Sequence, residues 1–431
     1  MQLLSAALQQ RYRALGKHGQ DVLWNFVSFA IMGVCGVLIN FIIAGFYDPA
    51  ALGVYNQVYA VYIVSSQFAV VGVHLSVLKY VAQYNDQPDE VRNIITAGML
   101  LSTVFALAAC GVLWALRWPI AGWMDSPGVG RGLGWALPGL FFFSLNKVIL
   151  FVLNAQERMK LYAVFQALRY VLMIAVIVVV ALLGLAGEYL SSVFTICELV
   201  LFLGMLPTIR AQLGWPALPA LRRWTRLHFD FGMRGFLSNV LLGLNPRVDV
   251  LILGYFSSDY VVGVFSLAAS AAEGLYQLPV VLRTNLNPRL VQLIAGEKME
   301  ELRTLARRSM RLTYLSILAV GAAAVAVYPL GLYLVANPQK FMQSWPIFAI
   351  LTAGIVLASG YIPFSNILLL AGRPGTHTLM ISLQVLFNIV GNLLLVPVMG
   401  GYGAAIATAL SYVFLIFLVK IFARRVLSLE I

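Results

Sequence analysis

Long apolar stretches follow one another along most of the chain, and short polar turns separate them. A helix that crosses the hydrocarbon core of a bilayer needs about 20 apolar residues. Because lipid offers no partner to backbone polar groups, repeated stretches of this length predict membrane-spanning helices. The predicted spans, about twelve in number, cover residues 22–46, 54–81, 94–116, 132–154, 161–183, 189–206, 231–256, 260–282, 312–336, 344–371, 379–398 and 402–422.

A polar break that is rich in proline and arginine divides the predicted spans into two equal groups. An even number of spans in each group makes the halves parallel repeats about an axis along the membrane normal. IIAGFYDPAALGVYNQVYA from Ile42 is similar to LILGYFSSDYVVGVFSLAAS from Leu251, which supports a repeat weakly, with chance similarity of apolar segments as the alternative. We expect an all-α polytopic membrane protein whose segments are an N-terminal surface helix, a six-helix bundle, a cytoplasmic linker and a second six-helix bundle, at residues 1–21, 22–206, 207–229 and 230–431.

The composition agrees with a membrane protein, because 61% of the residues are hydrophobic and only 11% are charged. The net charge of +12 is also typical of proteins that bind nucleic acid, but here the basic residues lie in short loops between apolar spans. Most of the 29 Lys and Arg lie on the side of the termini, and the exceptions in the opposite loops are Arg117, Arg131 and Lys340. This asymmetry predicts cytoplasmic termini and argues against a nucleic-acid partner.

The N-terminal segment and the cysteines add two smaller points. In residues 1–21, Leu4 and Leu8 share one helical face with basic residues around it, which predicts a helix on the cytoplasmic surface in contact with membrane lipids. The cysteines are Cys35, Cys110 and Cys197. All fall inside apolar spans without the spacing of a metal site, so we predict neither a disulfide framework nor a bound metal.

Basic side chains within the spans are candidate substrate contacts, because charge in hydrocarbon is costly unless it faces a partner or a wet cavity. They are Arg169, Lys147, Arg234 and Arg247, with Arg283 at the exit of a span. Arg169 shares a helical face with polar neighbours, which favours a position in the lumen. For Lys147 and Arg234 the alternative is snorkelling to the cytoplasmic surface. Arg247 is either an outer gate or part of a structural ion pair, and Arg283 is either a substrate contact or a topogenic charge.

Acidic residues and one histidine within the spans are candidates for coupling transport to H⁺ or Na⁺. Glu273 and Glu198 lie near mid-membrane, where a carboxyl group either carries a proton or forms a salt bridge with a basic residue. Asp249 and Arg247 stand at an i, i+2 spacing that points their side chains to nearly opposite helix faces, so the two need not pair. His74 titrates near neutral pH, although a histidine packed between helices is more common.

No metal cluster, nucleophile elbow, phosphate-binding loop or pair of carboxylates is visible in the sequence. We therefore predict a protein that is not an enzyme and that needs no cofactor. A membrane glycosyltransferase or ligase is the alternative from a different class. Such an enzyme acts on the outer side, and its outer loops would carry carboxylates or histidines, whereas the outer loops here are short.

One long stretch resembles a known family. The residues LLLAGRPGTHTLMISLQVLFNIVGNLLLVPVMGGYGAAIATALSYV, at positions 368–413, are similar to the C-terminal signature of polysaccharide-biosynthesis flippases of the multidrug/oligosaccharidyl-lipid/polysaccharide exporter superfamily. The similar features are the Gly-Arg-Pro loop at 372–374, Asn388, Asn392, Pro397 and the GYGAAIAT opening of the last span. The stretches VDVLILGYFSSDYVVGVFSLA and LGVYNQVYA also resemble this family.

This resemblance implies a flippase that moves a polyprenyl-diphosphate-linked oligosaccharide, or a related lipid-linked glycan, from the inner to the outer leaflet of the cell inner membrane. The implied fold is two six-helix bundles that form a V around a central cavity and work by alternating access, with polysaccharide assembly proteins as further partners. A cationic cavity suits an anionic diphosphate. The alternative within the superfamily is a cation-coupled multidrug extruder, which we favour less because the first span carries Asn25 and Asn40 and no acid.

Overall fold

The computed structural model describes residues 16–214, 217–335 and 337–427, and helices make up nearly all of them. Ten helices are long and apolar enough to cross a membrane, and two bent helix pairs bring the number of spans to 12. The predicted all-α membrane fold and the number of spans are confirmed. The surface helix expected over residues 1–21 falls mostly outside the described residues, and from Lys17 onward the chain already belongs to the helix of the first span.

The first half of the chain contains α2 (Lys17–Phe46), α3 (Pro49–Val70), α4 (Val73–Gln83), α5 (Pro88–Trp123), α6 (Pro127–Ala155), α7 (Met159–Leu182), the 3₁₀ turn η1 (Gly187–Ser191) and α8 (Ser192–Ile209). Proline begins α3, α5 and α6, where its missing N–H costs little because the N–H groups of a first turn have no acceptor within the helix. Asp48 and Ser126 precede α3 and α6, and each accepts a hydrogen bond from a first-turn N–H as an N-cap.

The second half contains the 3₁₀ turn η2 (Arg210–Gln212), α9 (Leu218–Leu244), η3 (Asn245–Arg247), α10 (Val248–Phe256), α11 (Asp259–Ala295), α12 (Met299–Leu332), α13 (Pro338–Phe341), α14 (Ser344–Ala358), η4 (Ile362–Phe364), α15 (Ile367–Leu370), α16 (Pro374–Met399) and α17 (Gly401–Leu427). The span expected at residues 344–371 is interrupted, because regular α-helix ends at Ala358 and Pro363 stands in η4 without an N–H to donate.

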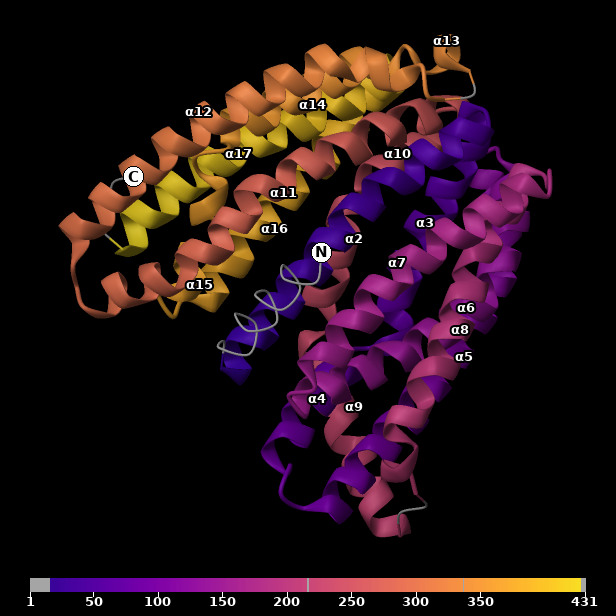
Figure 1. The fold of residues 1–431 in the computed structure, drawn as a ribbon, viewed down its shortest axis with the longest axis vertical. Helices are drawn as coiled ribbons and strands as arrows, with labels where there is room; N and C mark the ends of the chain where they lie inside the picture. The colour runs from indigo at the N-terminus through magenta and orange to yellow at the C-terminus, as the bar shows by residue number, and fades with distance from the viewer. Residues whose placement is uncertain (1–15, 215–216, 336, 428–431) are drawn as a thin grey trace, which may run out of the picture.

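The helices form two arms that diverge from one end, so that the molecule has the shape of a V (Figure 1). We call the arm built from α3 to α8 the N-arm and the arm built from α11 to α17 the C-arm. The arms join at the closed end, where α3, α10 and α13 lie, and they separate toward the open end. Helix α2 runs between the arms and contacts α7 of the N-arm and α11 of the C-arm. The V shape expected from the family resemblance is confirmed.

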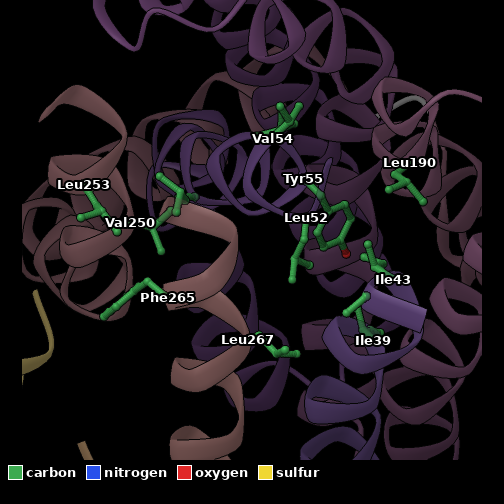
Figure 2. Close-up of a cluster of buried hydrophobic side chains, with 14 of the residues drawn as sticks. Ile39, Ile43, Leu52, Val54, Tyr55, Leu190, Val250, Leu253, Phe265 and Leu267 are labelled. Atoms are coloured by element: carbon green, nitrogen blue, oxygen red, sulfur yellow. The ribbon is translucent and has the colours of Figure 1, made fainter. Parts of the chain in front are cut away.

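A continuous apolar core joins the arms at the closed end. Figure 2 shows its side chains from both halves of the chain, among them Ile43, Leu52, Tyr55, Leu253 and Phe265. Lipid tails are as apolar as these side chains, so close packing rather than exclusion of water holds the helices together. Glycines permit the closest approach: a Cβ on Gly53 would lie 1.8 Å from the Asp259 backbone oxygen, and a Cβ on Gly263 would lie 1.8 Å from that of Pro49.

The span expected at residues 54–81 consists of α3 and α4, which are bent by 48°. At the break, Val71 and Gly72 adopt φ values of 45° and 71°. A Cβ added at Gly72 would lie 3.1 Å from the backbone of Gly232 in α9, so the break also makes room for a neighbouring helix. Such a break removes regular backbone hydrogen bonds, which a membrane protein tolerates where the backbone is covered by other helices.

Helix α9 begins inside the segment that we expected to be a linker. Its Trp224 is buried and donates a hydrogen bond from Nε1 to Glu90 of α5 at 2.7 Å. His228 is also buried, with Nδ1 2.8 Å from the Ser76 hydroxyl of α4. The first part of α9 is therefore fixed to the N-arm. Together with α10 it forms the second bent span, with an angle of 55°, which leads from the N-arm toward the closed end.

Candidate substrate and coupling sites

The most buried ion pair within the arms joins two of the residues that the sequence singled out. Arg169 of α7 places Nε 2.7 Å from a carboxylate oxygen of Glu198 in α8, and their side chains are 14% and 5% exposed. Asn146 of α6 donates from Nδ2 to the second oxygen of Glu198 at 2.8 Å. Of the two roles open to Glu198, the salt bridge is the one observed. The carboxylate compensates the charge of Arg169, and the role of Arg169 as a substrate contact stays a prediction.

Lys147 of α6 lies beside this pair and has no carboxylate partner within the described part of the chain. Its Nζ stands 5.9 Å from the centroid of the Phe143 ring, and the Arg169 guanidinium stands 5.1 Å from the same centroid. Lys147 is only half buried. Two cations therefore share one aromatic ring, and among the described residues Glu198 is the only carboxylate that forms an ion pair with either of them, so a net positive charge remains at Lys147.

His74 lies near Lys147 and forms no hydrogen bond with it among the described residues. It is 5% exposed in α4, and its ring meets the ring of Phe151 edge to face at a centroid distance of 4.6 Å. Its Nδ1 has no hydrogen-bond partner among the residues described. His74 is therefore packed between helices in this structure, and its role in coupling stays a prediction.

Arg247 of η3 lies between the two halves of the molecule, where it contacts residues of α3 and α11. Its guanidinium stands 4.6 Å from the centroid of the Tyr59 ring, which belongs to α3 of the N-arm. One of its nitrogens is 4.0 Å from a carboxylate oxygen of Glu273 in α11, and the Glu273 side chain is 52% exposed. A separation of 4.0 Å is a loose ion pair. Arg247 therefore connects the arms through an aromatic ring and a carboxylate that remains accessible.

Asp249 of α10 points into the C-arm, away from Arg247. Its carboxylate accepts hydrogen bonds from Asn392 Nδ2 of α16 at 2.7 Å and from the Thr408 hydroxyl of α17 at 2.6 Å. Asn388 donates in turn to the Thr408 hydroxyl at 3.3 Å. All these partners are neutral, and within the described ranges no Lys or Arg forms an ion pair with Asp249. A carboxylate with only neutral partners is suited to hold a proton or a small cation.

The two remaining candidates lie on different elements. Arg283 of α11 donates to the Ser365 hydroxyl at 3.1 Å, beside the interrupted span of the C-arm. Arg234 of α9 has an exposed side chain. Neither forms an ion pair with a carboxylate of the described residues. Arg169 and Lys147 thus lie together in the N-arm, while Arg247, Arg234 and Arg283 lie at separate places.

One contact between the arms was not found from the sequence. At the closed end, Asp259 of α11 accepts hydrogen bonds from Gln57 Nε2 of α3 at 2.7 Å and from the Ser126 hydroxyl at 2.8 Å. The similarity between the stretches around Gly53 and Gly263 marked this region, but an acid at a turn is ordinarily a solvated helix cap. Only the crossing of α3 and α11 brings it against the other arm.

The described residues hold no cluster of three or more His, Cys, Asp or Glu that would bind a metal ion. Any cation at Asp249 would instead be bound by one carboxylate with amide and hydroxyl oxygens, which are ligands that hard cations accept.

Solved structures share the fold: an inward-facing multidrug resistance MATE family transporter of the MOP superfamily has a TM-score of 0.74 at 16% identity, over 94% of this chain and 98% of its own. The lipid II flippase MurJ in an inward closed conformation has a TM-score of 0.75 at 13% identity, over 94% of this chain and 87% of its own. An outward-facing MATE family transporter has a TM-score of 0.56 at 13% identity, over 94% of both chains.

Identities this low establish the fold alone. None of the curated proteins matches the sequence. A family model, however, described as "Polysaccharide biosynthesis protein", matches residues 42–335, which is more than half of the chain. With its multi-pass helical architecture, the chain therefore belongs to the polysaccharide biosynthesis protein family.

Proposed function

We propose that this protein is a flippase that moves a polyprenyl-diphosphate-linked oligosaccharide, or a related lipid-linked glycan, from the inner to the outer leaflet by alternating access. The observation that carries the proposal is the pair of basic residues without a carboxylate partner, Lys147 in the N-arm and Arg283 in the C-arm. Membership of a polysaccharide biosynthesis family and a fold shared with transporters support the same function. The protein itself performs no covalent chemistry in this proposal.

The electrostatic reason is the charge of the headgroup. A diphosphate must cross about 30 Å of hydrocarbon, and an isolated charge at that depth is strongly disfavoured. Hydrogen bonds from cationic donors to phosphate oxygens are about twice as strong as neutral ones. Unpaired cations on both arms offset part of the desolvation cost, whereas Arg169, already neutralised by Glu198, contributes mainly to the architecture of the N-arm.

We propose that the open end of the V faces the cytoplasm and that the protein resides in the cell inner membrane. Basic residues concentrate in the loops on the side of the termini, which favours a cytoplasmic location for that side. The higher TM-scores to inward-facing and inward closed structures than to an outward-facing one agree with this orientation. A diphosphate-linked substrate assembled at the cytoplasmic surface would reach the arms from this end.

For the coupling ion, H⁺ or Na⁺, we propose Asp249 as the binding residue. Of the four candidates, Glu198 already pairs with Arg169, Glu273 pairs loosely with Arg247, and His74 is packed against an aromatic ring. Among these four, only the carboxylate of Asp249 accepts hydrogen bonds solely from neutral donors, which belong to α16 and α17. Binding and release of a cation there would change the contact between α10 and these helices, and so bias the position of the C-arm.

A translocation assay in proteoliposomes tests the proposal. Wild type, Lys147→Ala and Lys160→Ala are reconstituted with a polyprenyl-diphosphate oligosaccharide, and the fraction of headgroups reaching the opposite leaflet is measured with an impermeant glycosidase. Lys160 is a matched control because it is exposed at the start of α7 and stands over Trp24. We expect transport by wild type and Lys160→Ala and at least a tenfold slower rate for Lys147→Ala.

The second candidate function is export of cationic drugs. The fold shared with a multidrug resistance transporter and the half-exposed carboxylate of Glu273 favour it. Loading the same proteoliposomes with a cationic dye under a proton or sodium gradient separates the two functions. Expulsion of the dye without movement of the lipid-linked glycan would replace the flippase by the drug exporter.

A further inference from the structure

We propose that the interrupted span of the C-arm forms a binding site for a phosphate-bearing headgroup, built by Arg283, Ser365, His377 and the N-terminus of α16. This inference rests on the proposed function and gives it a place where the substrate first binds. The site combines side chains from three elements, of which Arg283 lies 82 residues before Ser365, and no carboxylate of the described residues forms an ion pair with Arg283.

The interrupted span supplies the frame of the site. Between Ala358 and Ile367 the chain is not regular α-helix, and the Ser365 side chain is buried there. Irregular backbone at membrane depth occurs where other protein covers it or where it lines a binding cavity. Broken helices of this kind supply the substrate sites of many transporters. Arg283 reaches this segment from α11 and donates to the Ser365 hydroxyl at 3.1 Å.

His377 completes the side-chain cluster. Its imidazole hydrogen-bonds to the backbone of Ser365 and lies close enough to Arg283 for their charges to interact. Its Nε2 is buried and has no partner among the residues described. A buried polar nitrogen without a partner is uncommon in a folded protein. In the protonated ring both nitrogens carry a hydrogen, so Nε2 would then donate to a phosphate oxygen, and the charge of the ring would add to that of Arg283.

Helix α16 adds a third source of positive potential. Its 26 residues begin at Pro374, and no side chain caps its N-terminus. Free N–H groups and the helix dipole make such an end favourable for anions. His377 lies in this first turn, which places the helix end beside Arg283. Lys420 of α17 adds a further cation, because its Nζ stands 5.2 Å from the ring of Tyr361 in the same interrupted span.

The depth of the site suits a lipid headgroup. Arg283 follows Asp259, at the closed end, by about 36 Å along α11 at the α-helical rise. The hydrocarbon core is about 30 Å thick, so Arg283 lies near the opposite membrane surface, where the phosphates of lipids reside. Lys147 lies deeper, about 12 Å from the end of α6. The C-arm would therefore bind the headgroup at the interface, before the headgroup reaches Lys147.

Binding to the full-length chain in lipid nanodiscs tests this site with farnesyl diphosphate as the probe. Arg283→Gln is compared with Arg289→Gln, a matched control on the same helix whose guanidinium pairs with Glu301 at 3.4 Å. We expect the Kd to rise about tenfold or more for Arg283→Gln and to stay within twofold for Arg289→Gln. Ser365→Ala, which removes only a hydroxyl, should also weaken binding and serves if Arg283→Gln does not fold.

Two competitors identify the source of the phosphate. If inorganic pyrophosphate displaces the probe with the same potency as unlabelled farnesyl diphosphate, the site binds a free anion. If pyrophosphate displaces the probe only weakly, the site binds a lipid headgroup. An equal loss of affinity in Arg283→Gln and Arg289→Gln would overturn the proposed site. An unchanged affinity in both Arg283→Gln and Ser365→Ala would also overturn it. That failure is distinct from failure of the proposed function, because wild type would still translocate lipid-linked glycan in the proteoliposome assay.

Discussion

The hydrogen bonds of Asp259 should hold the arms together at the closed end, and Asp259→Ala should release them. The carboxylate accepts from Gln57 at 2.7 Å and from Ser126 at 2.8 Å, and both donors belong to the first half of the chain. A hydrogen bond to a charged group contributes about 1.5–3 kcal/mol. Asp259 is only partly buried, so we expect about 2 kcal/mol for both bonds together, which is about a 30-fold change in the equilibrium between closed and opened arms.

Asp48→Ala is the matched control for this change. Asp48 stands at the start of α3 in the position that corresponds to the start of α11, and it accepts a hydrogen bond from the backbone N–H of Ala51 at 3.0 Å. Its loss removes a helix cap worth about 1 kcal/mol but breaks no hydrogen bond between the arms. Asp48→Ala should therefore lower the overall stability slightly and leave the arms closed.

Spin labels at Trp123 and Lys340 measure the separation, because these side chains are exposed near the closed end of the N-arm and of the C-arm. The native Cys35, Cys110 and Cys197 are first replaced by alanine. Pulsed electron spin resonance in nanodiscs should give one short distance for wild type and a growing population of longer distances for Asp259→Ala. An unchanged distribution, or an equal shift in the Asp48→Ala control, would refute the assignment of the closure to these hydrogen bonds.

Three further predictions concern the arms and the coupling site. Arg169→Ala should lower the stability by about 3–5 kcal/mol because it leaves Glu198 buried and uncompensated; thermal unfolding in detergent should show a lower Tm, largely restored when Glu198→Gln is added, and an unchanged Tm would argue against the pair. Gly53→Ala should open the closed end, since its Cβ would lie 1.8 Å from a backbone oxygen of the other arm, whereas Gly36→Ala, with nothing within 4 Å, should not; the spin-label distance checks both. Asp249→Asn should abolish the stimulation of transport by a proton or sodium gradient while downhill transport continues, and stimulation equal to that of wild type would contradict the proposed coupling role.

The sequence was sufficient for the fold because spans are determined by a local property. A run of apolar residues of sufficient length predicts a membrane helix without knowledge of its neighbours. The bends were less predictable: the break at Val71 and Gly72 accommodates the backbone of Gly232, which lies far away in the sequence. Proline at position 363 is a cause of the interruption that is visible in the sequence. The apolar residues continue past it, however, so the sequence alone did not show that the α-helix ends at Ala358.

The partners of the charged residues were beyond the reach of the sequence for a related reason. The residues with costly charge could be recognised one by one, since each stood inside an apolar span. Which carboxylate neutralises which cation depends on helix rotation and packing. Arg169 pairs with Glu198 while the nearby Lys147 does not. Asp259 was missed because it lies at a turn, where acids are common, and its partners come from the other half of the chain.

The unpaired cations also bear on how an empty carrier is kept from cycling without substrate. In the proposed mechanism, closing the open end brings the arm that holds Lys147 toward the arm that holds Arg283. Two like charges about 10 Å apart repel by about 1–2 kcal/mol at the effective dielectric constant of a protein surface. A bound diphosphate replaces this repulsion with attraction, because its negative charge attracts both Lys147 and Arg283. The return of the empty carrier then needs another source of free energy, which is the role that the proposal gives to a cation at Asp249 in the C-arm, where the carboxylate has only neutral partners.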